Sequence, residues 1–128
     1  MASSDHIRSV AERYAALITA HDADGVAGLY ADDAIVEDPA GSAPLVGRDE
    51  ILAFYRGAIE RVRPERVTVT GPVRMLADGS TAAIPLQSRS TRDGRRVVVD
   101  IIDIFTFDEA GSISSMRAYW GPENVNPA

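Results

Sequence analysis

The sequence predicts an α+β fold in which helices pack on one face of a curved, mainly antiparallel sheet and enclose a pocket. Apolar residues recur at helical spacing as far as residue 62, whereas the segments after Pro64 alternate with the period of a β-strand. Asp-Gly pairs at 78–79 and 93–94 are typical hairpin turns between such strands. Helices followed by a meander of strands are characteristic of the α+β class, and the length suits one domain over residues 1–128.

Three helices are predicted, over residues 5–21, 25–30 and 48–62. Capping residues or acidic side chains stand at the start of each, as helix N-termini favour. This assignment places three of the four tyrosines, Tyr14, Tyr30 and Tyr55, on the helices. Three buried hydroxyls would form either one hydrogen-bond network or three separate core positions, because a buried tyrosine requires a partner.

The first predicted strand is the short segment AIVEDP. It ends at Pro39, which forces Asp38 into an extended conformation. A loop over residues 40–47 separates that strand from the third helix. The remaining strands are predicted over residues 65–71, 72–76, 81–91, 97–107 and 112–120.

Composition excludes several kinds of chemistry. Cysteine is absent and all thirteen basic residues are arginine, so thiolate catalysis, disulfides and a lysine Schiff base are impossible. The net charge of −6, without a basic cluster, argues against nucleic acid or an anionic membrane as a partner. Because no apolar run resembles a signal peptide or a membrane span, a cytoplasmic location is expected. The two histidines have no carboxylate at metal-binding spacing, so no metal site is predicted.

The strand VVVDIIDIFTF, residues 97–107, carries two carboxylates among apolar side chains. Alternation puts Asp103 on one face with Val99 and Ile101, and it puts Asp100 on the other. Both faces are apolar, so alternation does not choose between the two acids, although the aromatic residues beside Asp103 suit a ligand cavity. The alternative is that either acid pairs with an arginine from a neighbouring strand, since buried charges are usually paired.

Six segments resemble bacterial ketosteroid isomerases (steroid Δ-isomerases) of the NTF2-like, or SnoaL-like, superfamily. They occur in the family's order over nearly the whole chain: ERYAAL, GLYADDAIVEDPAG, GRDEILAFYRGAI, TGPVR, VDIIDIFTFDEAG and MRAYWGPEN. The resemblance implies the NTF2-like cone. It also implies that Asp38 is a general base, that Tyr14 and a protonated Asp103 bind the substrate carbonyl oxygen, and that Tyr55 and Tyr30 continue the network behind Tyr14.

The resemblance further implies conversion of Δ5-3-ketosteroids to conjugated Δ4-3-ketosteroids through a dienolate, without a cofactor or metal. The partners would be a small apolar 3-oxo-steroid and a second copy of the chain, joined through the outer face of the sheet. Resemblance and strand alternation together predict six substrate contacts: Phe54, Leu86, Val99, Ile101, Met116 and Trp120.

The chemistry of the two acids would differ. Burial among Val99, Ile101, Phe105 and Trp120 would keep Asp103 protonated, while Asp38, beside a turn, would be wetter and ionised. Ketosteroid isomerases are an established case of an aspartic acid held neutral in an apolar site.

Part of the predicted wall departs from the family pattern. Alternation on the strand 81–91 points Ser88 and Ser90 inward, which makes this wall more polar, and Ala40 is smaller than expected. Other NTF2-like enzymes, a polyketide cyclase or an epoxide hydrolase, are alternatives, as is a non-catalytic ligand-binding domain. The hydrolase would require Arg74, Arg89 or Arg117 to point inward between two acids, and alternation places Arg89 outward.

Overall fold

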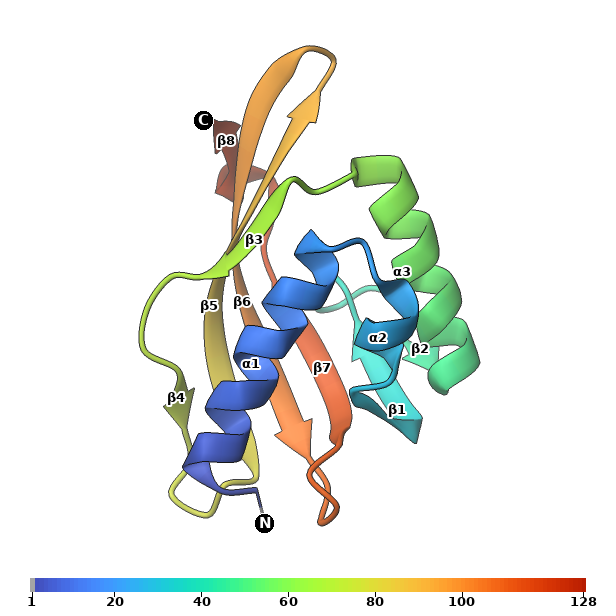
Figure 1. Cartoon of the computed structure of the whole chain (residues 1–128), viewed down its shortest axis with the longest axis vertical. Coiled ribbons are helices and arrows are strands. Elements are labelled where there is room, and N and C mark those ends of the chain that lie inside the picture. The colour runs from blue at the N-terminus through green and yellow to red at the C-terminus, as the bar shows by residue number, and fades with distance from the viewer. Residues whose placement is uncertain (1) are drawn as a thin grey trace.

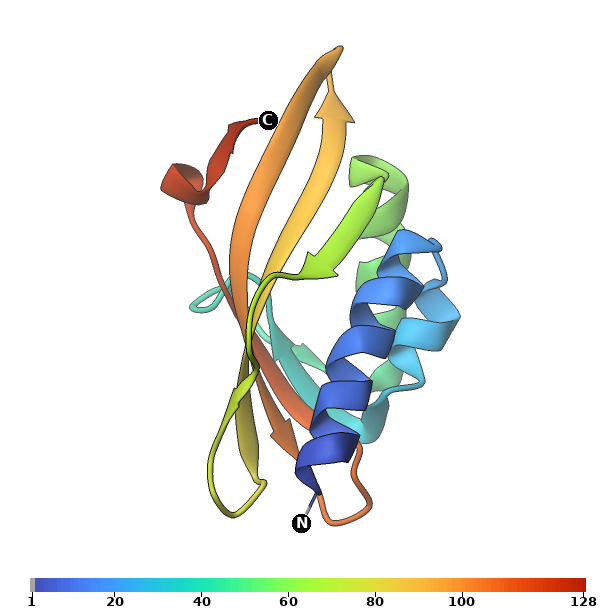
Figure 2. The same ribbon diagram turned by 60° about the vertical axis from the view of Figure 1, so that its left-hand side comes forward.

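The computed structural model describes residues 2–128 and shows three helices on one face of a curved sheet (Figure 1). Turning the molecule shows the sheet bending around the helices, with the β5–β6 hairpin extending beyond them (Figure 2). The α+β class is therefore confirmed. The elements, in chain order, are α1 (Ser4–Thr19), α2 (Ala23–Ala27), β1 (Tyr30–Glu37), β2 (Leu45–Val46), α3 (Arg48–Val62), β3 (Arg66–Val69), β4 (Arg74–Met75), β5 (Thr81–Arg92), β6 (Arg95–Phe107), β7 (Ile113–Tyr119), a 3-10 turn (Pro122–Asn124) and β8 (Val125–Pro127).

The sheet has the strand order β2-β1-β7-β6-β5-β3, with β4 added beside β5 and β8 beside β6. Its strands pair antiparallel except for β1 and β7, which are parallel. The parallel pairing brings the end of β1 next to the end of β7, where Glu37 stands opposite Arg117. Residues that follow these two strands, Asp38 and Trp120, are thereby placed side by side.

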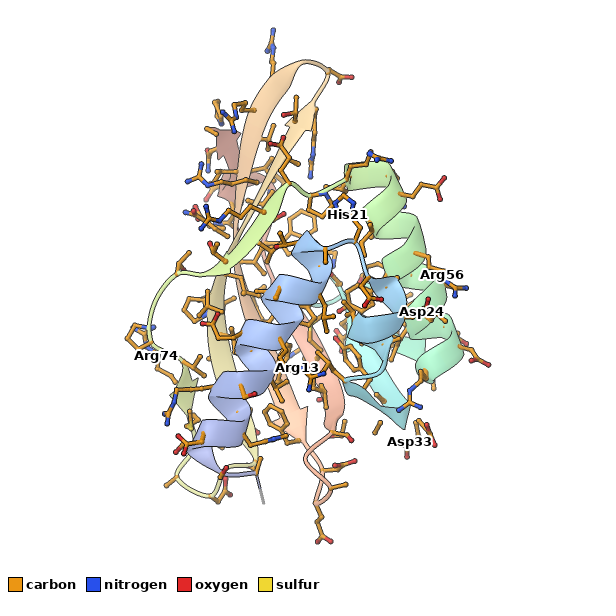
Figure 3. All side chains as sticks on the ribbon, in the orientation of Figure 1. Arg13, His21, Asp24, Asp33, Arg56 and Arg74 are labelled. Carbon is orange, nitrogen blue, oxygen red and sulfur yellow. The ribbon has the colours of Figure 1, made fainter. Side chains whose placement is uncertain are left out.

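Local sequence signals explain the helices. Ser3 caps α1 by accepting a hydrogen bond from the His6 amide at 3.1 Å, and Asp22 caps α2 by accepting one from the Gly25 amide at 2.8 Å. In α1 the buried side is formed by Ile7, Val10, Ala11, Tyr14 and Ala15. Figure 3 shows Arg56 beside Asp24, and this ion pair of 2.9 Å joins α3 to α2. No helix within residues 2–128 is long and apolar enough to cross a membrane.

Several predicted boundaries were wrong, among them the end of the first helix, which lies at Thr19. The second helix ends at Ala27 with Gly28 as its C-cap, so Tyr30 is the first residue of β1 instead of a helical residue. Glycine is a poor helix former and tyrosine favours strands, which explains the early end. The predicted loop 40–47 contains the two-residue strand β2, and β8 near the C-terminus was not predicted at all.

Both histidines join the ends of α1 to distant turns. His6 Nε2 lies 2.7 Å from the carbonyl oxygen of Gly111, and His21 Nε2 lies 2.6 Å from that of Pro64. The helix is thereby fixed across the open side of the sheet, above the inner faces of β5 and β6.

Candidate active site

A cavity lies between the helical layer and the inner faces of β5 and β6. Its walls are mainly apolar and contain two carboxylic acids, and the lining residues are Tyr14, Ile18, Asp38, Phe54, Tyr55, Ala58, Ile59, Val62, Pro64, Val67, Leu86, Ser88, Ile101, Asp103 and Ala118. This inner section holds about 140 Å³. An outer section of about 600 Å³ shares Asp38, Phe54 and Ser88 with it. Together they form one cleft of the size that small-molecule sites usually have, roughly 300–1,000 Å³.

Asp103 lies at the closed end of this cleft. It stands on the inner face of β6 between Ile84 of β5 and Ala118 of β7, and its exposed fraction is 2%. Burial raises the pKa of Asp103 well above its ordinary value, the nearby charge of Asp38 raises it as well, and the Tyr14 hydroxyl lowers it. None of the ion pairs within residues 2–128 involves Asp103. The alternative of a buried pair with arginine is therefore excluded for this residue.

Three tyrosine hydroxyls form a hydrogen-bonded chain behind the cavity. The hydroxyl oxygen of Tyr55 on α3 lies 2.9 Å from that of Tyr14 on α1 and 2.7 Å from that of Tyr30 on β1. All three side chains are buried, and burial raises the pKa of each phenol well above 10.0. The network interpretation is confirmed over that of three separate core residues, and Tyr14 is the member that lines the cavity.

Asp38 stands immediately after β1 and lines both sections of the cleft. Its Oδ1 accepts a hydrogen bond of 2.8 Å from Nε1 of Trp120. Burial raises the pKa of Asp38, and the indole N–H lowers it. Asp38 is half-buried, drier than its place beside a turn suggested but more exposed than Asp103. The two acids thus occupy different environments in one cleft.

The donor role of Trp120 was missed, because the tryptophan was predicted as an apolar contact. One signal was present in the sequence, since a partly buried indole N–H usually requires an acceptor. Finding Asp38 as that acceptor requires the parallel pairing of β1 with β7, which alternation within one strand does not reveal.

The six predicted substrate contacts separate into three groups. Phe54, Leu86 and Ile101 line the inner section. Val99 and Trp120 line the outer section, which Asp103 does not line. Met116 is fully buried in the core and lines neither section.

Sequence reasoning overlooked much of the helical wall. Ala58 and Val62 of α3 face the cleft, as do Ile18 of α1 and Val67 of β3. Ala58 and Val62 continue the stripe begun by Phe54 at helical spacing, so this part could have been found by extending the pattern. The contribution of β3 depends on its pairing with β5, which sets Val67 opposite Ser88.

The outer face of the sheet carries the remaining candidates. Asp100 is exposed and accepts a hydrogen bond of 2.9 Å from Nε2 of Gln87, which confirms its assignment away from the pocket. Arg89 is also exposed, as predicted. Arg117 pairs with Glu37 at 3.3 Å, and no arginine lines the inner section of the cleft among the described residues. The Asp-Arg-Asp set expected of an epoxide hydrolase is therefore not formed by Arg74, Arg89 or Arg117.

The two inward serines differ. Ser88 lines both sections of the cleft and adds a hydroxyl group to its wall. Ser90 is buried with no hydrogen-bond partner for its hydroxyl within residues 2–128, and it lines neither section.

A cone of helix and sheet around a mainly apolar cleft with two acids defines the class of the protein, and the family comparison agrees. The model of the SnoaL-like domain matches residues 11–116, so the chain belongs to the SnoaL-like (NTF2-like) family. Over 127 residues it is 33% identical to the steroid Delta-isomerase of Nocardioides simplex, covering 98% of this chain and 99% of that protein.

Relatives named for a different reaction are also similar. The chain is 31% identical over 123 residues to the epoxide hydrolase LasB of Streptomyces lasalocidi, covering 89% of this chain but only 41% of that longer protein. The solved structure of the epoxide hydrolase/cyclase-like enzyme SalBIII, from a study of pyran ring formation in salinomycin, superposes with a TM-score of 0.85. It covers 100% of both chains at 24% identity, and at that identity it supports the fold alone.

Proposed function

We propose that the protein is a steroid Δ-isomerase that moves a carbon–carbon double bond from the β,γ to the α,β position of a 3-oxo-steroid. The observation that carries the proposal is the unequal pair of acids in one apolar cleft. Asp103 is buried beside the tyrosine chain, whereas Asp38 is half-buried and accepts an indole hydrogen bond. Similarity to the Nocardioides simplex isomerase over the full length supports the same assignment.

In this mechanism Asp38 acts as the general base. The ionised carboxylate removes a proton from the carbon between the ketone and the double bond, and it returns that proton to the far end of the dienolate. One carboxylate can serve both carbons because they lie on the same face of a rigid substrate. Burial raises the pKa of Asp38, which strengthens the carboxylate as a base, while the Trp120 N–H favours the ionised form that must be present to accept the proton.

Tyr14 and Asp103 stabilise the dienolate oxygen. Proton removal places negative charge on the former ketone oxygen, and two fixed donors in a dry site stabilise that charge better than mobile water does. An ionised Asp103 would repel the oxygen, so this role requires the neutral acid. The raised pKa of Asp103, which follows from its burial and from the charge of Asp38, supports that requirement.

The second candidate is epoxide opening, favoured by the similarity to LasB. Two acids in one cleft could supply a base for an attacking hydroxyl and a donor for the epoxide oxygen. The absence of arginine from the inner section, within the described residues, favours the isomerase.

The decisive test is the Asp38→Asn variant, assayed on androst-5-ene-3,17-dione by the absorbance of the conjugated enone. Loss of the base should lower kcat by about 10²–10⁴-fold, because positioned general bases contribute that much. Asp100→Asn, an exposed acid of the same type, is the matched control and should retain full rate. Wild-type protein that forms no enone, or an Asp38→Asn variant with near-normal rate, would refute the proposal.

We also propose a homodimer formed through the outer face of the sheet. Three large apolar side chains are exposed on that face, namely Ile35 at 44%, Ile102 at 48% and Tyr119 at 48%. Ile102 and Tyr119 are direct neighbours across β6 and β7. Exposed large apolar side chains on one face of a sheet are typical of a protein–protein contact.

A further inference from the structure

Two arginines line the outer section of the cleft, at the end away from Asp103. They are Arg61 of α3 and Arg92 of β5, and the other residues of this section include Pro39, Val99 and Trp120. The apolar inner section contains no arginine among the described residues. The arginines therefore lie in the outer section alone, whereas Asp38 lines both sections and Asp103 lines the inner one.

Both arginines are placed there by regular structure. Phe54, Ala58 and Arg61 follow one another at helical spacing, so Arg61 lies roughly 10 Å beyond Phe54 along α3. On β5, Arg92 shares by alternation the inner face with Ser88 and Ser90. Figures 1 and 2 show this end of β5 and β6 extending beyond α3.

Neither arginine is committed to a partner within the chain. Five arginines form ion pairs within residues 2–128, and Arg61 and Arg92 are not among them. The side chain of Arg61 makes one long hydrogen bond of 3.4 Å, to the carbonyl oxygen of Gly57 in its own helix. Two uncompensated guanidinium groups at one opening are unexpected in a chain whose net charge is −6. They are available to an anion that enters the cleft.

We propose that the natural ligand carries a carboxylate at the end opposite its ketone, and that Arg61 and Arg92 bind this group. The inference rests on the proposed function, which places the ketone beside Tyr14 and Asp103. Guanidinium groups bind carboxylates through paired hydrogen bonds, and among the described residues only the outer section of the cleft provides them. Ser88, between the two ends, adds a polar contact along the same wall.

The spacing decides where on the ligand the carboxylate must be. Asp103 and Val99 are four residues apart on β6, which corresponds to roughly 13 Å, and Arg92 lies farther along the hairpin. A rigid ring system that starts at Asp103 would fill the apolar part of the cleft. The carboxylate would then have to sit on a flexible side chain beyond the rings, and not directly on them.

The test compares the binding of 3-oxochol-4-en-24-oate, which has such a side chain, with that of its methyl ester. Titration calorimetry below the micelle-forming concentration would give both dissociation constants for wild type, Arg61→Gln, Arg92→Gln and the double variant. The matched control is Arg89→Gln, which removes the same charge from the outer face of β5.

We expect the wild type to bind the acid at least about fivefold more tightly than the ester, an advantage that added salt reduces. Each single variant should lose about threefold in affinity for the acid, and the double variant about tenfold, because partly exposed ion pairs contribute such amounts. Affinity for the ester should not change, and Arg89→Gln should behave like wild type. Equal affinity of the wild type for acid and ester, or equal losses for both ligands in the variants, would overturn the inference.

Turnover of androst-5-ene-3,17-dione separates this result from the proposed function. If the protein converts that neutral steroid but does not prefer the acid, the carboxylate site is refuted and the isomerase proposal stands. A preference for the acid without conversion would support the carboxylate site and refute the isomerase.

Discussion

Replacing Asp103 with asparagine should stabilise the protein increasingly as the pH rises. In the folded protein Asp103 is 2% exposed, and its burial and the charge of Asp38 raise its pKa well above the ordinary value of 3.8. In the unfolded chain the same carboxyl group returns to that ordinary value. At a pH above that ordinary value, folding therefore requires that Asp103 take up a proton, which costs free energy. Asparagine has no proton to exchange.

The sign and size of the effect follow from proton linkage. At a pH below the ordinary pKa, Asp103 is protonated in both the folded and the unfolded protein, and the wild type has its full stability. Between that value and the folded pKa the unfolded state binds fewer protons, so the free energy of unfolding falls by about 1.4 kcal/mol for each pH unit. Above the folded pKa the loss stops. Asp38, whose pKa is also raised, contributes equally to both proteins and cancels in the difference.

Urea unfolding followed by circular dichroism from about pH 5 to about pH 8 would measure this difference at fixed protein concentration. The free energy of unfolding of Asp103→Asn minus that of wild type should rise with pH and then level off at the folded pKa. Asp100→Asn, which removes an exposed acid on the outer face, should show no such rise. Parallel curves for Asp103→Asn and wild type would refute the conclusion that Asp103 is neutral in the folded protein.

Three further perturbations test other parts of the site. Trp120→Phe removes the N–H that lowers the pKa of Asp38, so the acid limb of the kcat/KM profile for enone formation should move to higher pH; an unmoved limb would contradict this. Tyr55→Phe leaves its two tyrosine partners without their shared hydroxyl and should cost about 1–3 kcal/mol in urea unfolding; an unchanged midpoint would show that the network is not stabilising. Ile102→Arg should convert a dimer to monomers in sedimentation experiments, and a wild type that is already monomeric would exclude the proposed interface.

Periodicity predicted those parts of the fold whose signal is contained within one segment. The long strand around Asp103 was correctly divided into two faces, because alternation needs no knowledge of neighbouring strands. The choice of the Asp103 face as the dry one depends on which layer covers it, and that is a property of the packed protein. Strands of two or three residues, such as β2 and β8, are too short to show a period.

The candidate site was harder to predict, since its members meet through pairings between distant segments. Asp38 and Trp120 are 82 residues apart and come together through the parallel pairing of β1 with β7. Tyr30 was assigned to a helix because its segment has helical spacing, although Gly28 ends that helix before it. The error moved Tyr30 between layers but left it within reach of Tyr55.

The tyrosine chain also allows a direction of donation that suits the cleft. Each phenol has one proton to donate, so Tyr30 donating to Tyr55 and Tyr55 donating to Tyr14 leaves the proton of Tyr14 free to point into the cleft. In that arrangement an acceptor that arrives at Tyr14 meets three hydroxyl dipoles aligned head to tail. Negative charge gained by the acceptor would polarise the hydrogen bonds of all three hydroxyls in the same sense. The stabilising polarisation would then extend from the cavity wall into the core as far as Tyr30 on β1.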